Sequence, residues 1–434
     1  MSSHVSRTYL AYVILLLFLV NAANYGQRMI IAIILPAIKA EIVLTDAQLG
    51  ILMGGGFALF FAVAGVPLAR LADRSVRRTF LAGTILFWSS ATALFGATST
   101  FAQMLTARVA LGVGESACIP TSHSLLTDYV APDNRPLAFG IHSTGGVFGV
   151  TLALMLGGYL AAAIGWRNTM YLAAIPGFLL AILVFVTLRE PARQGTSASE
   201  LQVRHFPLKA VVQHLLSTKS YVFVLLAICF SLLVEFGLNQ WLPSFYVRQF
   251  GLAMEDVGYS YGLAIASGGI PGSIIGGLVA NRLVRSDVRW LAWLPATMYA
   301  IALPVGLLML LASTAQQALV LNALYAFVIF ATNGALWAAC FISVPPMMRA
   351  TTSAITLMVG GIFGVAVGPV LVGLISDFLA PRAGSHSLRS SLVAVECLAI
   401  VVVVFLLIAA RHLRKEQLNP AGSPLAIAGA SAAS

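Results

Sequence analysis

Residues 48–74 read QLGILMGGGFALFFAVAGVPLARLADR, and residues 256–282 read DVGYSYGLAIASGGIPGSIIGGLVANR. The two stretches align without a gap, and the alignment places Gly50 over Gly258. Both are apolar, rich in small residues and long enough to cross a bilayer, which takes about 20 helical residues. This duplication predicts a membrane protein built from two related halves.

A shorter block repeats in the same relative places of the two halves. Residues 145–150 read GGVFGV, and residues 360–365 read GGIFGV. Glycine is common in membrane helices, so a single block carries little weight. Two matched blocks favour an internal repeat, and paired six-helix repeats are typical of transporters that rock between two states.

Composition also places the chain in a membrane. Of its 434 residues, 59% are hydrophobic and only 9% are charged, against about 25% charged residues in an ordinary soluble domain. Continuous apolar runs predict an all-α membrane protein of twelve helices in two six-helix bundles, because the strands of a membrane β-barrel would alternate apolar and polar residues. The expected spans are residues 9–38, 47–69, 79–97, 102–124, 136–161, 168–188, 220–247, 257–281, 289–312, 316–342, 351–376 and 390–411. The first run is too long for a signal peptide, so we interpret it as the first membrane helix.

The positions of lysine and arginine predict the orientation. Of 25 such residues, 18 fall on one side of twelve alternating spans and five on the other, while Arg28 and Arg108 lie within spans. Both termini are therefore expected in the cytoplasm, in a multi-pass protein of the cytoplasmic (inner) membrane. The net charge of +10 follows from this topology and from attraction to anionic headgroups of the bilayer, so no nucleic acid is expected as a partner. The five are Lys39, Arg167, Arg248, Arg382 and Arg389.

The longest hydrophilic connection predicts the domain organisation. We expect a six-helix bundle at 1–188, a cytoplasmic linker at 189–219, a second bundle at 220–411 and a flexible cytoplasmic tail at 412–434. No cofactor, metal or disulfide is expected, because each cysteine lies alone in an apolar run, and no nucleotide-binding Gly-x-x-x-x-Gly-Lys-Ser/Thr pattern is present. The cysteines are Cys118, Cys229, Cys340 and Cys397.

Residues 68–78 read LARLADRSVRR and resemble the loop between the second and third helices of the major facilitator superfamily, Gly-x-x-x-Asp-Arg-x-Gly-Arg-Arg. Ala69 and Val76 stand at the two glycine positions. The resemblance implies ion pairs that close an inner gate, and a change in such a cluster would shift the balance between inward-open and outward-open states. A loop that is positive only to set topology is the alternative, but it leaves the acid unexplained. The matching residues are Asp73, Arg74, Arg77 and Arg78, and their expected partners are Asp128 and Arg135 or the eleventh helix.

The same loop has a counterpart in the second half. Residues 277–285 read GLVANRLVR, with Asn281 in place of the aspartate and Arg282 after it. We include both among the expected gating residues.

Three further segments resemble the bacterial branch of the spinster family within that superfamily. They are NYGQR at 24–28, RVALGVGESACIPTSHSLLTDYVAPDNR at 108–135 and FGLNQWLPSFYVRQFGL at 236–252. The similarity runs from the first helix to the twelfth. It implies a secondary transporter of an amphiphile, such as a lysophospholipid or a sphingolipid-like molecule. A small organic anion or peptide-like solute remains the alternative cargo, because related branches with similar first and fourth helices carry carboxylates.

One position departs from the family pattern. The first helix usually reads Asn-Tyr-x-Asp-Arg, and this chain has Gln27 where the aspartate belongs, between Tyr25 and Arg28. The resemblance implies that the missing acid takes part in proton binding and pairs with the arginine. The partner of Arg28 is therefore sought elsewhere.

Arg28 needs a reason to lie inside an apolar run, since an arginine there costs about 3 kcal/mol on insertion scales. Asn21, Asn24 and Arg28 share one helical face at spacings of three and four, and we expect this face to line a central cavity. A guanidinium is always charged and can hold a carboxylate or phosphate through two hydrogen bonds. We interpret Arg28, with Asn24 and Tyr25 beside it, as the binding site for an anionic group of the cargo.

The fourth helix supplies an acid. Arg108 and Glu115 are seven residues apart with Gly112 between them, so both face one side of the helix. Burial disfavours the charged form of a carboxylate and a nearby cation favours it, so Glu115 is positioned to gain and lose a proton. We predict that Glu115 couples protons to transport and that Arg28 exchanges between Glu115 and cargo. A permanent pair of Glu115 with Arg108 or Arg28 that only joins helices is the alternative.

The second half has fewer charges but one unexpected acid. Glu235 precedes Asn239 by one turn, with Gln240 and Trp241 next to it. Glu235 either replaces the carboxylate lost at position 27 or is an acid at a helix end close to outer water. Asn333 and Trp337, one turn apart, are further candidates for the cavity lining.

Two histidines and one glutamate lie in apolar helices without an assigned partner. His123 and His142 are either proton carriers or hydrogen-bonded packing residues. Glu396 is interpreted as structural.

A secondary active transporter explains the duplicated halves, the central charges and the gate loop together. A membrane enzyme would need a catalytic set such as His-x-x-x-His or Ser/His/Asp at membrane depth, and the sequence shows none. A channel or receptor would not need a duplicated gate loop. We therefore expect a monomeric, proton-coupled transporter of a small molecule or lipid, and no enzyme.

Overall fold

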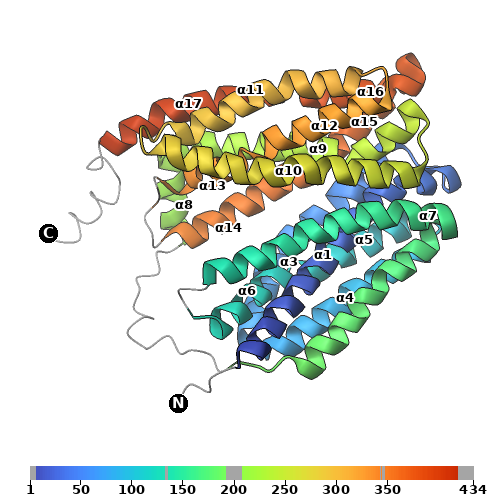
Figure 1. Cartoon of the computed structure of the whole chain (residues 1–434), viewed down its shortest axis with the longest axis horizontal. Helices are drawn as coiled ribbons and strands as arrows, with labels where there is room; N and C mark the ends of the chain where they lie inside the picture. The colour runs from blue at the N-terminus through green and yellow to red at the C-terminus, as the bar shows by residue number, and fades with distance from the viewer. Residues whose placement is uncertain (1–5, 132–134, 192–207, 343, 345–347, 419–434) are drawn as a thin grey trace. The chain divides into compact units, whose positions relative to one another are not determined.

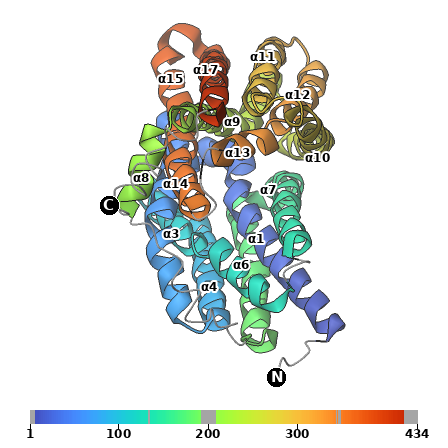
Figure 2. The same ribbon diagram turned by 90° about the vertical axis from the view of Figure 1, so that its left-hand side faces the viewer.

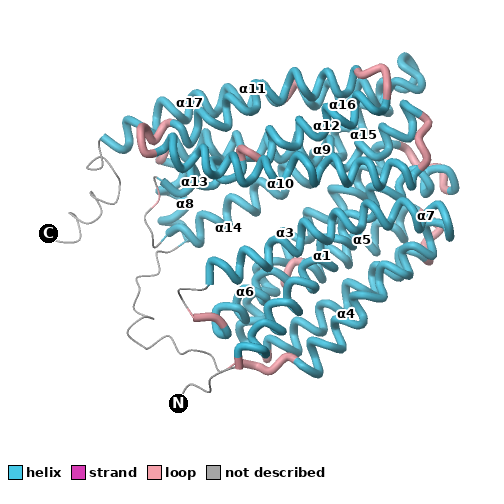
Figure 3. Tube along the Cα trace, viewed as in Figure 1, coloured by secondary structure: helices cyan, strands magenta, loops and turns pink. Residues whose placement is uncertain are grey.

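The structure is a computed structural model that describes residues 6–131, 135–191, 208–342, 344 and 348–418. Within these ranges the chain is helical, and no strand is present (Figures 1 and 3). The helices of the first half are α1 (Arg7–Glu41), α2 (Asp46–Gly50), η1 (Ile51–Gly55), α3 (Gly56–Arg74), α4 (Arg77–Gly96), α5 (Phe101–Glu115), α6 (Cys118–Tyr129) and α7 (Arg135–Thr187).

The second half continues the same pattern. Its elements are α8 (Leu208–Ser217), α9 (Lys219–Phe250), α10 (Met254–Val284), α11 (Trp290–Leu311), α12 (Ala315–Phe330), α13 (Asn333–Ile342), α14 (Arg349–Gly360), η4 (Gly361–Ala366), α15 (Val367–Ala383), η5 (Gly384–His386), α16 (Ser387–Glu396) and α17 (Ala399–Leu418).

The chain forms two compact units. Unit 1 contains the described parts of Met1–Thr196, Asn239–Gly262 and Pro369–Pro381, and unit 2 contains the described parts of Ser197–Leu238, Leu263–Gly368 and Arg382–Ser434. The bundle, linker and tail boundaries expected from the sequence stay a prediction, and part of that linker (192–207) and of that tail (419–434) lies outside the described residues.

Helices account for nearly all of the described chain, which confirms the expected all-α membrane class. Nine helical segments in the described ranges are long and apolar enough to cross a bilayer. Two of them, Ala138–Thr187 and Thr351–Arg414, each cover two expected spans, and the first of these is interrupted at Gly165, whose φ of 81° is outside the helical region. The segment is therefore two helices joined at Gly165.

The span expected at 102–124 consists of two helices, because α5 ends at Glu115 and α6 begins at Cys118. Pro120 explains the interruption, since a proline ring clashes with the carbonyl four residues earlier, here that of Ser116. The Ser116 hydroxyl donates a hydrogen bond of 2.8 Å to the Val113 carbonyl. The break places Glu115 at the end of a helix inside the membrane region.

Glycines let α1 and α7 run side by side (Figures 1 and 2). A Cβ added at Gly149 would lie 2.0 Å from the Ala22 carbonyl oxygen, and one added at Gly145 would lie 2.4 Å from that of Phe18. Backbone-to-backbone contact of this kind is available only to glycine. The repeated glycine block of the first half is therefore a helix-packing surface.

We expect Gly149→Ala to destabilise unit 1, because the new methyl group would force α1 and α7 apart. Overpacking of this kind costs about 1–3 kcal/mol, and thermal unfolding in detergent should show a lower Tm. Gly140→Ala is the matched control, since it lies on the same helix with no neighbouring atom within 4 Å of the added Cβ. An equal Tm for both variants would contradict this packing role.

Candidate functional site

Arg28 of α1 and Glu115 of α5 form an ion pair in unit 1. Arg28 Nε donates to Glu115 Oε2 at 3.0 Å, and an Nη of the same guanidinium lies 2.9 Å from that oxygen. The other oxygen, Oε1, has no hydrogen-bond partner among the described residues. The Glu115 side chain is fully buried, whereas the Arg28 side chain is 13% exposed. The cation is therefore the accessible member of the pair.

Aromatic rings enclose the Arg28 guanidinium. Its carbon lies 4.8 Å from the ring centre of Tyr25, 4.6 Å from that of Phe57 and 4.9 Å from that of Phe61. A cation over an aromatic face gains about 0.5–2 kcal/mol, more as water is excluded. Arg28 also donates to Asn24 Oδ1 at 3.2 Å, so two of the three residues of the expected polar face of α1 are bonded to each other. Phe57 and Phe61, which line this site, carry no signal in the sequence that separates them from other phenylalanines.

Arg108 does not hydrogen-bond to Glu115. Its Nε donates to the Leu52 carbonyl at 2.8 Å and an Nη to the Met53 carbonyl at 3.3 Å, although the charge of Arg108 acts on Glu115. Both carbonyls belong to the π-helical turn η1, where wider winding leaves carbonyls without their usual partners. Arg108 thus fastens α5 to the span that starts with α2.

Gln27 faces away from this pair. Its Nε2 donates to the Ala173 carbonyl at 2.9 Å, and its Oε1 accepts from the Thr92 hydroxyl at 3.0 Å. The side chain therefore joins α1 to α4 and α7. It also borders an apolar cavity of about 440 Å³ that α1 and α7 otherwise line with hydrophobic residues and glycine.

The remaining candidates of the first half lie near one another on α1, α6 and α7. Asn21 donates to the His142 carbonyl at 2.8 Å, and the His123 and His142 rings meet edge to face at 5.0 Å. The Nε2 atoms of both histidines lack a partner among the described residues. Their roles stay predictions.

The candidates of the second half do not form a single cluster in either unit. In unit 1, Asn239 accepts from the Tyr261 hydroxyl and Trp241 Nε1 donates to the Pro369 carbonyl at 2.9 Å. In unit 2, Trp337 stacks on Phe341, and Asn333 is the first residue of α13. Trp241 is fully buried, and the roles expected for these residues stay predictions.

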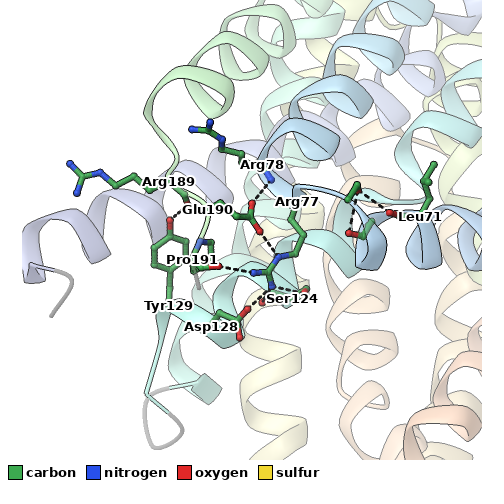
Figure 4. A network of polar contacts seen from close by, with 11 residues as sticks. Leu71, Arg77, Arg78, Ser124, Asp128, Tyr129, Arg189, Glu190 and Pro191 are labelled. Carbon is green, nitrogen blue, oxygen red and sulfur yellow. Dashed lines mark hydrogen bonds and ion pairs between the residues drawn. The ribbon is translucent and has the colours of Figure 1, made fainter. Parts of the chain in front are cut away.

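An arginine-centred network ties α4 to α6 and to the end of α7 (Figure 4). The Arg77 side chain is 3% exposed, and it reaches Asp128 at 2.5 Å, Glu190 at 2.9 Å and the Ser124 hydroxyl at 3.0 Å. The second Glu190 oxygen accepts from the backbone N–H of Arg78 at 3.0 Å. Asp128 was expected in such a cluster, whereas Glu190 was missed because it stood in the sequence as part of a hydrophilic linker.

The other expected gating residues contribute less. Arg74, Asn281 and Arg282 are exposed, and no ion pair among the described residues includes them. The side chains of Asp73 and Arg135 lie outside the described part of the chain. In the described part of the chain, Arg77 supplies the cation that Asp128 binds.

A second polar network in unit 1 centres on Asp46, at the start of α2. The Asp46 carboxylate binds Arg248 of α9 through two hydrogen bonds of 2.8 and 2.9 Å, Lys39 at 2.5 Å and the Ser376 hydroxyl at 2.7 Å. The backbone N–H groups of Asp46 and Ala47 donate to a further residue, the Asp377 carboxylate, at 2.9 and 2.7 Å. Four helices are joined at this point, and Asp46 is 4% exposed.

Sequence analysis missed this Asp46 network. A local signal existed, because Thr45 and Gln48 form a capping box that marks the start of α2. Apart from Lys39, however, the partners of Asp46 are more than 200 residues away, and no sequence pattern links them to it.

Among the described residues no group of three or more His, Cys, Asp or Glu side chains could hold a metal ion.

Comparison with known proteins gives one family match that covers most of the chain. The model of the Major Facilitator Superfamily matches residues 17–369. An MFS-type efflux pump of Mycolicibacterium smegmatis is 29% identical over 406 residues, which cover 93% of this chain and 94% of that protein. A hexuronate transporter of Bacillus subtilis is 24% identical over 400 residues, covering 90% of this chain and 93% of that protein.

Solved structures agree. The crystal structure of a bacterial homologue of the human lysosomal transporter spinster, in an inward-facing and unoccupied conformation, superposes with a TM-score of 0.86 at 26% identity. The match covers 95% of this chain and 99% of that chain.

Proposed function

This chain belongs to the major facilitator superfamily and is a spinster-like membrane transporter, and we propose that it moves an anionic amphiphile across the membrane in exchange for, or together with, protons. The cargo's anionic group binds Arg28, and Glu115 carries the proton. The observation that supports this most directly is the ion pair between a fully buried Glu115 and a partly exposed Arg28.

The proposed coupling follows from competition for one cation. While Glu115 is ionised, its Oε2 accepts a hydrogen bond from the Arg28 guanidinium. Protonation of Glu115 removes the negative charge, and the guanidinium can then bind another anion. An incoming carboxylate or phosphate can take that place through two parallel hydrogen bonds. Because burial of the charged pair is costly, proton binding to Glu115 changes the affinity of Arg28 for cargo, and cargo binding to Arg28 changes the proton affinity of Glu115.

The rings around Arg28 favour an amphiphile. Tyr25, Phe57 and Phe61 offer apolar surface next to the cation, which suits a molecule with an anionic head and a hydrocarbon tail. The resemblance to spinster-like proteins points the same way. A small organic anion is the second candidate, because the Bacillus subtilis relative is a hexuronate transporter.

A thermal-shift series tests the cargo class, since a ligand that binds only the folded state raises its Tm. Lysophosphatidic acid carries an anion and a tail, a monoacylglycerol of equal chain length carries only the tail, and glucuronate carries only the anion. We expect lysophosphatidic acid to give the largest rise in Tm for the wild type and none for Arg28→Ala. The monoacylglycerol should leave the Tm unchanged.

The series has two contrary outcomes. A rise with glucuronate alone would assign the transporter to organic anions. An equal rise for wild type and Arg28→Ala with lysophosphatidic acid would remove Arg28 from cargo binding. Glu41→Ala is a matched control, because Glu41 pairs with Arg167 at the exposed end of α1, away from Arg28.

A further inference from the structure

Unit 2 encloses a carboxyl group that the proposed coupling does not use. Glu396 is the last residue of α16, and two residues separate it from the start of α17. The residue is fully buried. Its Oε2 accepts a hydrogen bond of 2.9 Å from the Tyr325 hydroxyl of α12, and its Oε1 has no partner among the described residues.

The neighbouring helix α11 makes room for this carboxyl. A Cβ added at Gly306 would lie 2.5 Å from Glu396 Oε1 and 3.0 Å from the Tyr325 ring. Any other residue at position 306 would push the carboxyl out of its place. The glycine therefore fits the enclosed acid and the tyrosine together.

In the described part of the chain, no positive charge pairs with Glu396. None of the ion pairs formed by these residues includes it, in contrast to Glu115 with Arg28. An ionised carboxylate left in a dry interior is far more costly than an unpaired neutral O–H. The cheaper arrangement is a protonated Glu396 whose carbonyl oxygen accepts from Tyr325.

Two other titratable side chains of unit 2 come from neighbouring stretches of the chain. Tyr299 of α11 is buried, and Glu235 of α9 is partly exposed. Among the described residues, Tyr325 is the hydrogen-bond partner of Glu396. The enclosed carboxyl therefore depends on a neutral hydroxyl and not on a charged group.

We propose that Glu396 is a second proton-binding site of this transporter, located in unit 2, enclosed next to Gly306 and bonded by the Tyr325 hydroxyl. Glu396 holds its proton at neutral pH. This assigns a chemical role to the acid that the sequence alone led us to interpret as structural.

Infrared difference spectroscopy of the purified protein in lipid tests this site directly, because a protonated carboxyl has a C=O stretching band that a carboxylate and an amide lack. We expect the wild type at neutral pH to show such a band and Glu396→Gln to lose it. Tyr325→Phe should retain the band at a higher frequency, because the carbonyl loses its hydrogen bond. A merely structural glutamate in ionised form would give neither change.

Two controls make the result decisive. Glu41→Gln alters an exposed glutamate that is paired with Arg167, and it should leave the band unchanged. Glu235→Gln should also keep the band at neutral pH, because the burial of Glu396 and its hydrogen bond from Tyr325 stay the same. A wild-type spectrum at neutral pH without a band that depends on Glu396 would overturn the proposal. So would an unchanged frequency in Tyr325→Phe.

This inference is separable from the proposed function. The spectrum requires neither cargo nor transport, so it can succeed if Glu115 proves not to couple protons. Conversely, Glu115→Gln should leave the Glu396 band in place. Loss of the band in Glu115→Gln would show that the signal belongs to Glu115 and would contradict a second site.

Discussion

Glu115→Gln is expected to reduce pH-gradient-driven uptake in proteoliposomes to the level of empty liposomes, while exchange of internal for external cargo continues. The amide keeps the shape and the hydrogen-bonding reach of the glutamate toward Arg28, but it cannot bind or release a proton. With the charge absent, Arg28 is free for cargo throughout the cycle, so exchange has no reason to stop. Driven accumulation needs the proton and is lost.

Arg28→Ala should abolish both activities. Removing the guanidinium deletes the cargo's anionic contact and leaves Glu115 fully buried with no hydrogen-bond donor, since Arg28 is the donor to its Oε2. Arg28→Lys is the matched variant, because it keeps the charge and loses the planar fork and much of the aromatic stacking, so partial activity is expected. Full gradient-driven uptake by Glu115→Gln would remove that residue from coupling. Normal transport by Arg28→Ala would refute cargo binding at this site.

Asp46→Asn is expected to populate a second conformation of the helix ends in unit 1. The carboxylate accepts two hydrogen bonds from Arg248 and one each from Lys39 and the Ser376 hydroxyl, and an amide cannot replace them. Loss of hydrogen bonds to charged groups costs about 1.5–3 kcal/mol, or roughly a ten- to hundredfold change in an equilibrium constant. Only the state with these ends joined loses that stabilisation, so its population should fall.

Spin labels at two exposed positions, Val43→Cys and Ala253→Cys, measure this change by double electron–electron resonance in a cysteine-free background. The wild type should give one distance, and Asp46→Asn should add a longer one. Glu41→Gln is the control, because its pair with Arg167 joins α1 to α7 within the first half of the chain and should leave the distribution unchanged. A single, unaltered distance in Asp46→Asn would show that the Asp46 network does not hold these helix ends together.

The fold could be predicted well because its signals are local. Apolar runs of bilayer length and the repeat of 48–74 at 256–282 require no knowledge of distant contacts. The division of the 102–124 span into α5 and α6 was not expected, because the apolar composition gave no sign of it, although Pro120 conflicts with the Ser116 carbonyl. The start of α2 at Asp46 does have a local signal, the capping box of Thr45 and Gln48.

The candidate site could be predicted only where a charged residue lies within an apolar span. Arg28 and Glu115 stand out as charges in apolar helices, so their meeting was a reasonable expectation. Asp46, Arg248 and Asp377 lie at helix ends, where charged residues are ordinary, and only the folded chain brings them together. Phe57 and Phe61 were equally hidden, because a ring beside a cation looks in sequence like any other apolar residue.

Gln27 occupies a position of the family motif, but its side chain bonds to α4 and α7 and not to Arg28. The amide of Gln27 donates to one backbone carbonyl and accepts from one hydroxyl, and a carboxylate can only accept. An aspartate at this position has no N–H group, so it could not donate to the Ala173 carbonyl. Replacement of Gln27 by aspartate would therefore remove a side-chain bond that joins α1 to α7, in addition to adding a charge.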